Sequence, residues 1–270
     1  MSYSELQYLS LLSRTLDWGT DREDRTGVGV RSLFAPASLT FINVDQEFPL
    51  LTTKKMAWKS ILAETLWFLQ GRSDLESLRT DGCTWWDDWE KEDGTLGPVY
   101  GKQLRHWQKP DGTEHDQLAW IIDEIKANPT SRRLVATMWN AGELEEMALP
   151  PCHGALMQFY VDGNFLDLHV NIRSSDLFLG LPTNIASYAL VLLILARETE
   201  LKGRDLIVTL GDAHIYNNHM EAVRTQIRRK PSPLPQVAIS GVESLDDLRP
   251  GNFHLIDYNP QDKITAPIAV

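Results

Sequence analysis

Apolar residues recur at helical spacing in several segments of the chain. In the first segment they lie three or four positions apart and the pattern stops at Gly19, as in an amphipathic helix. Residues 54–70 and 185–200 are apolar on nearly every side, which predicts helices buried in a core. The predicted helices cover residues 5–18, 54–70, 117–127, 185–200 and about 217–228.

Alternating and β-branched segments predict strands. LMQFYV and NFLDLHV flank Asp162-Gly163, so they predict a hairpin with a tight turn at these two residues. Leu-Pro-Thr-Asn at 181–184 predicts a turn before the next helix. The chain shows no repeat or obvious linker, which favours one domain over residues 1–270. The predicted strands cover residues 29–48, 133–139, 155–173 and 206–211.

The predicted hairpin brings Cys152, just before its first strand, near Arg173, at the end of its second. A thiol beside a guanidinium is a candidate nucleophile, because a nearby positive charge favours the thiolate. The alternative is a structural cysteine buried in a strand, which is the commoner case for an arbitrary Pro-Pro-Cys-His segment.

Net charge, cysteine count and the absence of certain motifs argue against several classes of protein. The net charge of −11 argues against a dedicated nucleic-acid binder. Cys83 and Cys152 cannot build a disulfide framework, which favours a reducing, cytoplasmic location. No stretch of about 18 residues is apolar throughout, so we expect no membrane span. The chain has no Walker loop or GxGxxG motif, and its His and Cys residues lack metal-ligand spacing, so we expect no metal.

Polar or aromatic residues in apolar surroundings are further candidates. Glu64 lies between apolar residues of a predicted buried helix, where it is either half of a structural salt bridge or a catalytic acid. Trp85, Trp86 and Trp89 form a cluster that suits either core packing or a stacking wall for a flat heterocycle.

Several basic and hydroxyl side chains are weaker candidates for ligand binding. Arg25 lies in a Gly-rich turn that suits either an anion or solvent. Arg132 and Arg133 should point to opposite sides of a strand, so a surface pair is the default interpretation. His214 and Tyr216 follow a short strand and suit either a ligand hydroxyl or a structural role.

Many motifs together resemble one family, the folate-dependent thymidylate synthases. The resemblance runs from about Leu6 to the C-terminus. It is carried by DRTGVGV, FPLLTTKK, ETLWFLQG, WDDW, GPVYGKQ, SRR, MALPPCH, RSSDLFLGLPTNIASYAL, GDAHIYNNH and the terminal APIAV.

The resemblance implies a fold and a reaction. The fold is a single α+β domain in which a large twisted mixed sheet packs against long helices and one sheet face forms a homodimer interface. The reaction is the reductive methylation of dUMP to dTMP, with 5,10-methylenetetrahydrofolate as co-substrate and dihydrofolate as by-product. No metal is implied.

The resemblance also implies roles for individual residues. Cys152 matches the nucleophile that adds to C6 of the uracil ring, and Arg132 and Arg133 match arginines supplied by the other subunit. Asn184 matches the residue that reads the base: its amide pairs with O4 and N3–H of uracil, whereas an Asp would suit cytosine. The implied catalytic set is Cys152, Glu64, Tyr100, His153, Arg173 and Asn184. The implied dUMP-binding set is Arg25, Arg132, Arg133, Arg173, Ser174, Asp176, Asn184, His214 and Tyr216. The implied folate-binding set is Trp85, Trp86, Leu149, Asp176 and Val270.

Three features depart from the family pattern. Ile172 stands where Gln is common, Trp85 stands where Ile is usual, and one extra residue lies between Cys152 and Gln158, which suggests a bulge. These departures leave open a dUMP 5-hydroxymethylase, in which water captures the one-carbon intermediate. A non-catalytic RNA-binding regulator is a third hypothesis, which the acidic charge and the complete catalytic set disfavour.

Overall fold

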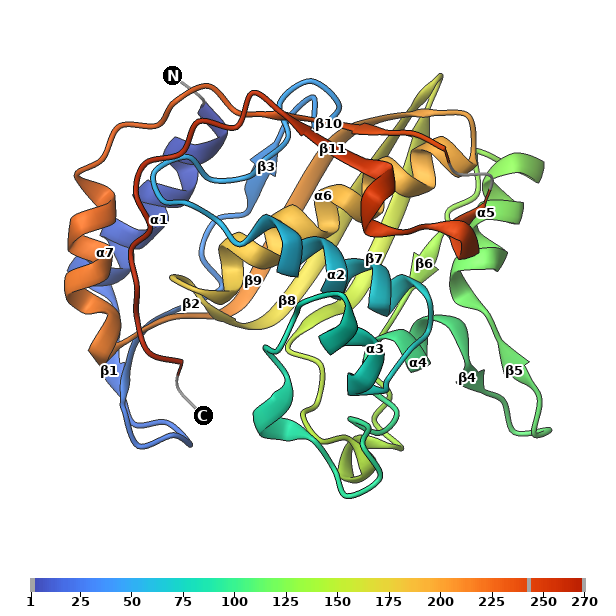
Figure 1. The fold of residues 1–270 in the computed structure, drawn as a ribbon, viewed down its shortest axis with the longest axis horizontal. Helices are drawn as coiled ribbons and strands as arrows, with labels where there is room; N and C mark the ends of the chain where they lie inside the picture. Colours follow the sequence, from blue (N-terminus) through green and yellow to red (C-terminus); the bar gives the residue numbers. More distant parts are fainter. Residues whose placement is uncertain (1–2, 242–243, 269–270) are drawn as a thin grey trace.

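The chain folds around one large mixed sheet (Figure 1). The computed structural model describes residues 3–241 and 244–268. The strands of this sheet lie in the order β1-β2-β9-β8-β7-β6, and β3 also pairs with β9. β8 and β9 run parallel, whereas the other neighbours are antiparallel. The strands are β1 Thr20–Arg22, β2 Val30–Phe34, β3 Leu39–Phe41, β6 Val135–Ala136, β7 His153–Asp162, β8 Phe165–Asp176 and β9 Lys202–Tyr216.

The predicted hairpin is confirmed as β7 and β8. Asp162 pairs with Phe165, so the turn residues are Gly163 and Asn164, one position later than predicted. Gly163 has φ 58°, a conformation that costs a glycine little. The suggested bulge is also present, because the pairing jumps from His153–Ile172 to Leu156–Asn171.

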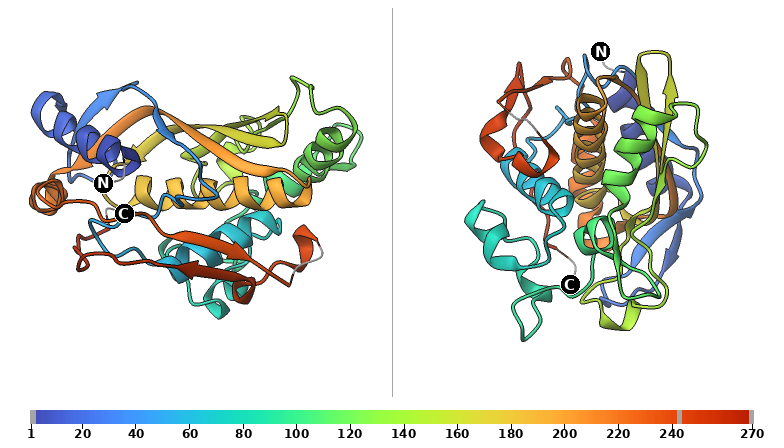
Figure 2. Two further views of the ribbon diagram at one scale, coloured as in Figure 1. Left: turned by 90° about the horizontal axis from the view of Figure 1, so that it is seen from above. Right: turned by 90° about the vertical axis from the view of Figure 1, so that its right-hand side faces the viewer.

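Helices form layers on one side of the sheet (Figure 2). Helix α6 packs on β8 and β9, and α2 packs on the far side of α6. A small sheet of β10 and β11 lies in the same outer layer as α2. The remaining pair, β4 with β5, is a separate two-stranded ribbon. These strands are β4 Trp107–Gln108, β5 Glu114–His115, β10 Gln236–Ile239 and β11 Phe253–Ile256. The helices are α1 Tyr3–Trp18, α2 Trp58–Leu69, α3 Leu75–Thr80, α4 Gly101–Arg105, α5 Gln117–Ala127, α6 Gly180–Glu198 and α7 Met220–Ile227. Short 3-10 helices are η1 Asp87–Trp89, η2 Leu144–Glu146, η3 Asn217–His219, η4 Leu245–Asp247 and η5 Pro250–Asn252.

The predicted single α+β domain with a mixed sheet packed against long helices is therefore confirmed. Along β7, Met157 and Phe159 are buried, whereas Leu156, Gln158 and Tyr160 on the other face are exposed. That exposed face is the one for which a homodimer interface is predicted, and the interface itself stays a prediction.

Some predicted boundaries were wrong. Leu-Pro-Thr-Asn is not a turn but the start of α6, since a proline is tolerated in the first helical turn. The strand predicted over 133–139 is only Val135–Ala136, so Arg132 and Arg133 precede it. The strand predicted over 206–211 extends in β9 to Tyr216, and 29–48 holds two short strands rather than one.

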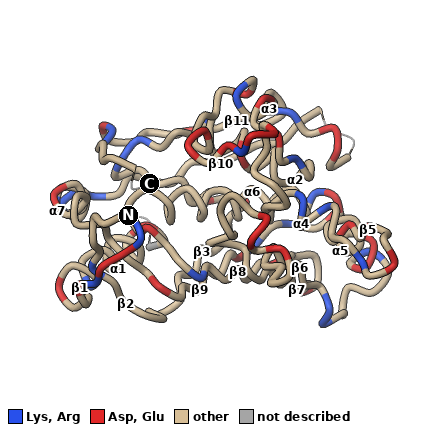
Figure 3. The backbone as a smooth tube through the Cα atoms, turned by 90° about the horizontal axis from the view of Figure 1, so that it is seen from below, with Lys and Arg blue, Asp and Glu red and all other residues tan. Residues whose placement is uncertain are grey.

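Although no membrane span was expected, helix α6 is long and apolar enough to cross a membrane by length and composition. However, 78% of its apolar window is buried inside the protein, as expected for a core helix. Figure 3 shows α6 at the centre of the molecule almost free of charged residues, with Lys and Arg positions scattered among Asp and Glu around it.

Candidate active site

Cys152 lies immediately before β7 and faces the phenol of Tyr100. The thiol is partly exposed, and its Sγ lies 3.5 Å from the Tyr100 hydroxyl. The same hydroxyl accepts the backbone N–H of Cys152 at 3.2 Å. Tyr100 is fully buried and has φ 31°, a strained value for a non-glycine residue. The fold therefore holds one hydroxyl against both the thiol and the backbone of Cys152.

Arg173 returns on β8 to the loop that carries Cys152, as the hairpin predicted. Its Nε donates to the carbonyl of Pro151 at 2.8 Å, and a second nitrogen donates to that of Pro150 at 3.0 Å. The guanidinium also lies 4.9 Å from the centre of the Trp139 ring. Arg173 thus stabilises the loop before β7 through two hydrogen bonds to its carbonyl groups.

The charge of Arg173 lowers the pKa of the Cys152 thiol, as its predicted position implies, but burial has the larger effect. Burial raises the pKa of Cys152, and the Tyr100 hydrogen bond and the charge of Arg173 offset only part of this effect. Without a ligand, the thiol is therefore the stable form at neutral pH, and it must lose its proton when it reacts.

His153 lies in an aromatic stack behind the thiol. Its ring lies 4.7 Å from that of Tyr100, and its Nδ1 lies 2.7 Å from the hydroxyl of Tyr188 on α6. Burial lowers the pKa of His153 to about 3, so the imidazole is neutral. Sequence reasoning did not assign Tyr188, although it lies four positions after Asn184 and hence on the same face of α6.

Glu64 is buried on α2 and accepts a hydrogen bond from the indole N–H of Trp86 at 2.6 Å. Burial raises the pKa of Glu64 to about 7, although the hydrogen bond from Trp86 opposes the shift. No ion pair of Glu64 is present among residues 3–241 and 244–268. The structural salt bridge is therefore not the explanation, and a carboxyl that titrates near neutral pH suits proton transfer.

Polar side chains on β8 and α6 lie beyond the thiol. The backbone N–H of Ser174 donates to the Cys152 carbonyl at 3.3 Å, which places the Ser174 side chain next to the loop. Asn184 is buried near the start of α6, and no hydrogen bond holds its amide within the described part of the chain. An amide that is not committed to a protein partner is suited to pair with a ligand.

The end of β9 adds a second group of polar side chains. His214 is opposite Asp176 in the sheet, its Nδ1 lies 3.0 Å from Asp212, and its ring meets that of Tyr216 edge to face. Burial raises the pKa of Tyr216, and the charge of Arg25 offsets part of this effect. Arg25 is exposed in the loop before β2, and this loop lies at the same end of β9 because Asn217 N–H donates to the Gly29 carbonyl.

Of the remaining predicted site residues, Arg132 and Arg133 lie away from Cys152, whereas Trp85 and Leu149 lie against the core. Arg132 and Arg133 are exposed, and Leu134 next to them bonds to Phe159, seven residues along β7 from Cys152. At about 3.3 Å per residue that separation is roughly 20 Å, so this chain does not bring the two arginines to its own thiol. Trp85 and Leu149 are partly buried against the core. Val270 lies outside the described residues.

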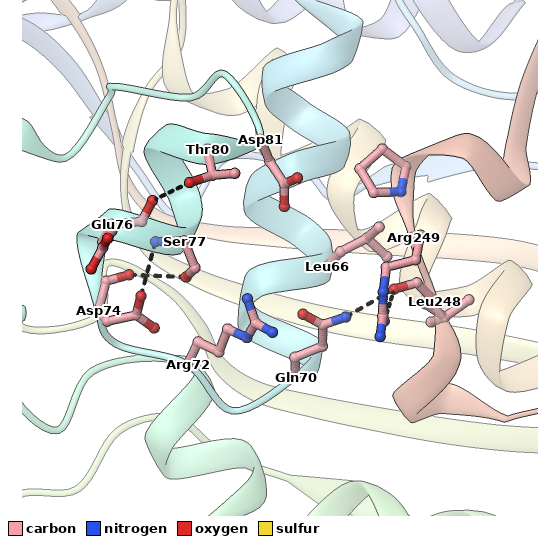
Figure 4. A pocket seen from close by; sticks show the side chains of 11 residues that line it. Leu66, Gln70, Arg72, Asp74, Glu76, Ser77, Thr80, Asp81, Leu248 and Arg249 are labelled. Carbon is pink, nitrogen blue, oxygen red and sulfur yellow. Dashed lines mark hydrogen bonds between the residues drawn. The ribbon is translucent and has the colours of Figure 1, made fainter.

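A surface pocket of about 440 Å³ lies elsewhere, between α2, α3 and η5 (Figure 4). Its lining carries two guanidinium groups and three carboxylates, from Arg72, Arg249, Asp74, Glu76 and Asp81. Several of these polar groups already bond to neighbouring residues, and no predicted site residue lines the pocket. We therefore place the chemistry at Cys152, where burial perturbs a thiol, a carboxyl and an imidazole together.

The fold and the groups around Cys152 define a single-domain mixed α/β enzyme with a candidate cysteine nucleophile. A family model described as thymidylate synthase matches residues 6–270. The thymidylate synthases of Coxiella burnetii strains Dugway 5J108-111 and RSA 493 / Nine Mile phase I are each 48% identical to the chain over 265 residues, covering 98% of it and 99% of each relative. The chain belongs to the thymidylate synthase family.

This result confirms the predicted family and the predicted activity, a methyltransferase of the thymidylate synthase type. Neither the family match nor these relatives support the hydroxymethylase alternative.

Proposed function

We propose that this chain converts dUMP into dTMP with 5,10-methylenetetrahydrofolate as co-substrate, and that Cys152 is the nucleophile. The observation that carries the proposal is the position of the Cys152 thiol, partly exposed, against the Tyr100 hydroxyl, together with buried His153 and Glu64, whose pKa values burial shifts. The roles of the individual residues are part of this proposal.

dUMP would bind along the edge formed by the ends of β8 and β9. Arg25, Arg173 and the Ser174 hydroxyl would hold the phosphate, because guanidinium and hydroxyl donors suit phosphate oxygens. His214 and Tyr216 would bind the sugar hydroxyl. The free amide of Asn184 would donate to O4 of uracil and accept from N3–H.

In the reaction the Cys152 sulfur bonds to C6 of uracil while its proton leaves. The electron pair of the C5–C6 double bond moves toward C5 and the O4 carbonyl, so C5 becomes the nucleophile. Glu64, whose pKa is raised to about 7, can protonate O4 and later accept a proton. The neutral His153 bonds to the Tyr188 hydroxyl, and its ring packs against that of Tyr100.

Bound next to C5, the reduced folate supplies a one-carbon unit and then a hydride. Trp85, Trp86 and Leu149 would form an apolar wall for its flat ring, and Asp176 would accept from its ring N–H groups. The indole N–H of Trp86 is already donated to Glu64, so Trp86 can offer only its ring face. Val270, at the chain end, is the predicted cover of this site.

We further propose a homodimer in which Arg132 and Arg133 reach the phosphate of the partner's site. Their separation of roughly 20 Å from the Cys152 end of β7 supports this role, as does the exposed apolar face of β7 that carries Leu156 and Tyr160.

A product analysis tests the proposal. Purified protein is mixed with dUMP and 5,10-methylenetetrahydrofolate, nucleotides are separated by mass spectrometry, and the near-ultraviolet absorbance of dihydrofolate is followed. We expect dTMP and dihydrofolate in equal amounts. A nucleotide heavier than dTMP by one oxygen, without dihydrofolate, would instead identify a hydroxymethylase.

A further inference from the structure

His219, at the end of η3, connects the folate side of the site to the C-terminal tail. Its side chain is fully buried. Its Nε2 lies 2.7 Å from the carbonyl oxygen of Pro267, and its Nδ1 lies 3.6 Å from Oδ1 of Asp176. In the described part of the tail after Asp262, no other hydrogen bond ties the tail to the rest of the protein. Within the described tail, Ile264 and Ala266 pack against the core, and His219 makes the hydrogen bond that holds the tail at Pro267.

The two contacts of His219 decide its protonation state. A carbonyl oxygen only accepts, so Nε2 must carry a hydrogen. If Nδ1 were unprotonated, its lone pair would be buried against a carboxylate, and Nδ1 has no hydrogen-bond partner among residues 3–241 and 244–268. A proton on Nδ1 removes this conflict and gives an imidazolium paired with Asp176. The geometry thus favours the cation.

The other groups around His219 do not reverse this conclusion. Burial and the nearby Lys54 ammonium disfavour the charged imidazole, but Asp176 and the Pro267 carbonyl outweigh them, so the pKa of His219 is raised. Tyr216 from β9 and Phe178 from the loop after β8 face it with rings at 5.4 and 5.6 Å.

Two further titratable groups interact with Asp176, the partner of His219. His214 of β9 helps to keep the pKa of Asp176 low, and Tyr8 of α1 is held in its neutral form by burial and by the charge of Asp176. Asp176 therefore stays ionised at neutral pH and remains available as the counter-ion of His219.

We propose that His219 is a positioning residue, which in its cationic form clasps the C-terminal tail at Pro267 with Asp176 as its counter-ion. Because Asp176 is also the carboxylate proposed to meet the folate, the clasp couples folate binding to the position of the tail. This second statement rests on the proposed function, whereas the clasp itself does not.

The clasp has a definite pH dependence. A histidine with a raised folded-state pKa contributes fully below its ordinary pKa of about 6.5, and the contribution is lost as pH rises through the folded-state value. The tail should therefore loosen at alkaline pH, and a variant without a titrating group at position 219 should lose the part of this change that His219 contributes. Lys54, whose pKa burial lowers to about 8, titrates in both proteins.

His219→Gln tests the clasp, because glutamine keeps a neutral N–H donor and removes the charge. The matched control is His254→Gln, an exposed histidine on β11 that bonds to Ser240. Release of C-terminal residues by a carboxypeptidase is measured from about pH 6 to pH 9 as the ratio of variant to wild type, which cancels the pH dependence of the protease. A charged hydrogen bond is roughly twice as strong as a neutral one, so we expect a ratio of about fivefold at pH 6 that falls toward one at pH 9.

Two further readouts separate the clasp from a merely structural role. Nitrogen NMR of labelled wild-type histidines should show His219 doubly protonated at neutral pH and neutral in Asp176→Asn. The KM for the folate should rise severalfold in His219→Gln in the same pH window. A carboxypeptidase ratio that does not vary with pH, or a neutral wild-type His219, would overturn the proposal. If no dTMP is formed at all, the proposed function fails while the protease and NMR results still decide the clasp.

Discussion

Glu64→Gln should stabilise the protein at alkaline pH while it removes activity. The folded protein holds the Glu64 proton up to a pKa of about 7, whereas the ordinary value is 4.5. The folded state therefore binds more protons than the unfolded state between these values, and stability is lost as pH rises through this window. Glutamine keeps the oxygen that accepts from Trp86 but cannot ionise.

The size of the effect follows from the shift. At about 1.4 kcal/mol per pKa unit, the buried carboxylate costs the wild type about 1 kcal/mol at pH 5 and about 3 kcal/mol at pH 8. Glu64→Gln should raise the free energy of unfolding by these amounts, and should lower kcat by roughly 10²- to 10⁴-fold because a proton-transfer group is lost.

Urea unfolding at both pH values, at one protein concentration, measures the difference. Glu76→Gln on α3, where the carboxylate is exposed, is the matched control and should show no pH-dependent gain. If the gain from Glu64→Gln were the same at pH 5 and pH 8, burial would not control the titration of Glu64.

Three other changes test the site. Cys152→Ser should lower turnover on the order of 10⁴-fold or more, with dUMP affinity changed by less than about 1 kcal/mol; calorimetry and rate assays check both, and substantial residual turnover would exclude the covalent mechanism. Asn184→Asp should shift the kcat/KM ratio between dUMP and dCMP by about 100-fold or more, and unchanged discrimination would refute the base-reading role. Tyr188→Phe removes the hydroxyl bonded to His153 and should cost about 1–3 kcal/mol in urea unfolding, whereas an unchanged stability would mean that the contact contributes nothing.

Local patterns in the sequence predicted much of the fold. The hairpin was predictable because two alternating segments flank a glycine, and this hairpin alone places Arg173 beside Cys152. The helix over 117–127 was predicted to the residue, and the structure shows Asp116 capping its start and Pro129 following its end. Strand neighbours such as β2 and β9 were not predictable in this way, because their pairing depends on contacts far apart in sequence.

Properties of the site that depend on burial or on distant partners were predicted less well from the sequence. The charge of Arg173 was visible in the sequence, but the larger effect of burial on the Cys152 thiol was not. Tyr188 and His219 were missed because their partners, His153 and Pro267, lie 35 and 48 positions away in the chain. Both residues lie in motifs that carry the family resemblance, but no local pattern assigned them a partner.

The most direct test of the central claim is to look for the covalent bond itself. The protein is quenched in acid during turnover with dUMP and 5,10-methylenetetrahydrofolate, digested, and its peptides are analysed by mass spectrometry. We predict a nucleotide attached to the peptide that contains Cys152, and none in Cys152→Ser. Formation of dTMP without any adduct, or an adduct on Cys83 instead, would contradict the account.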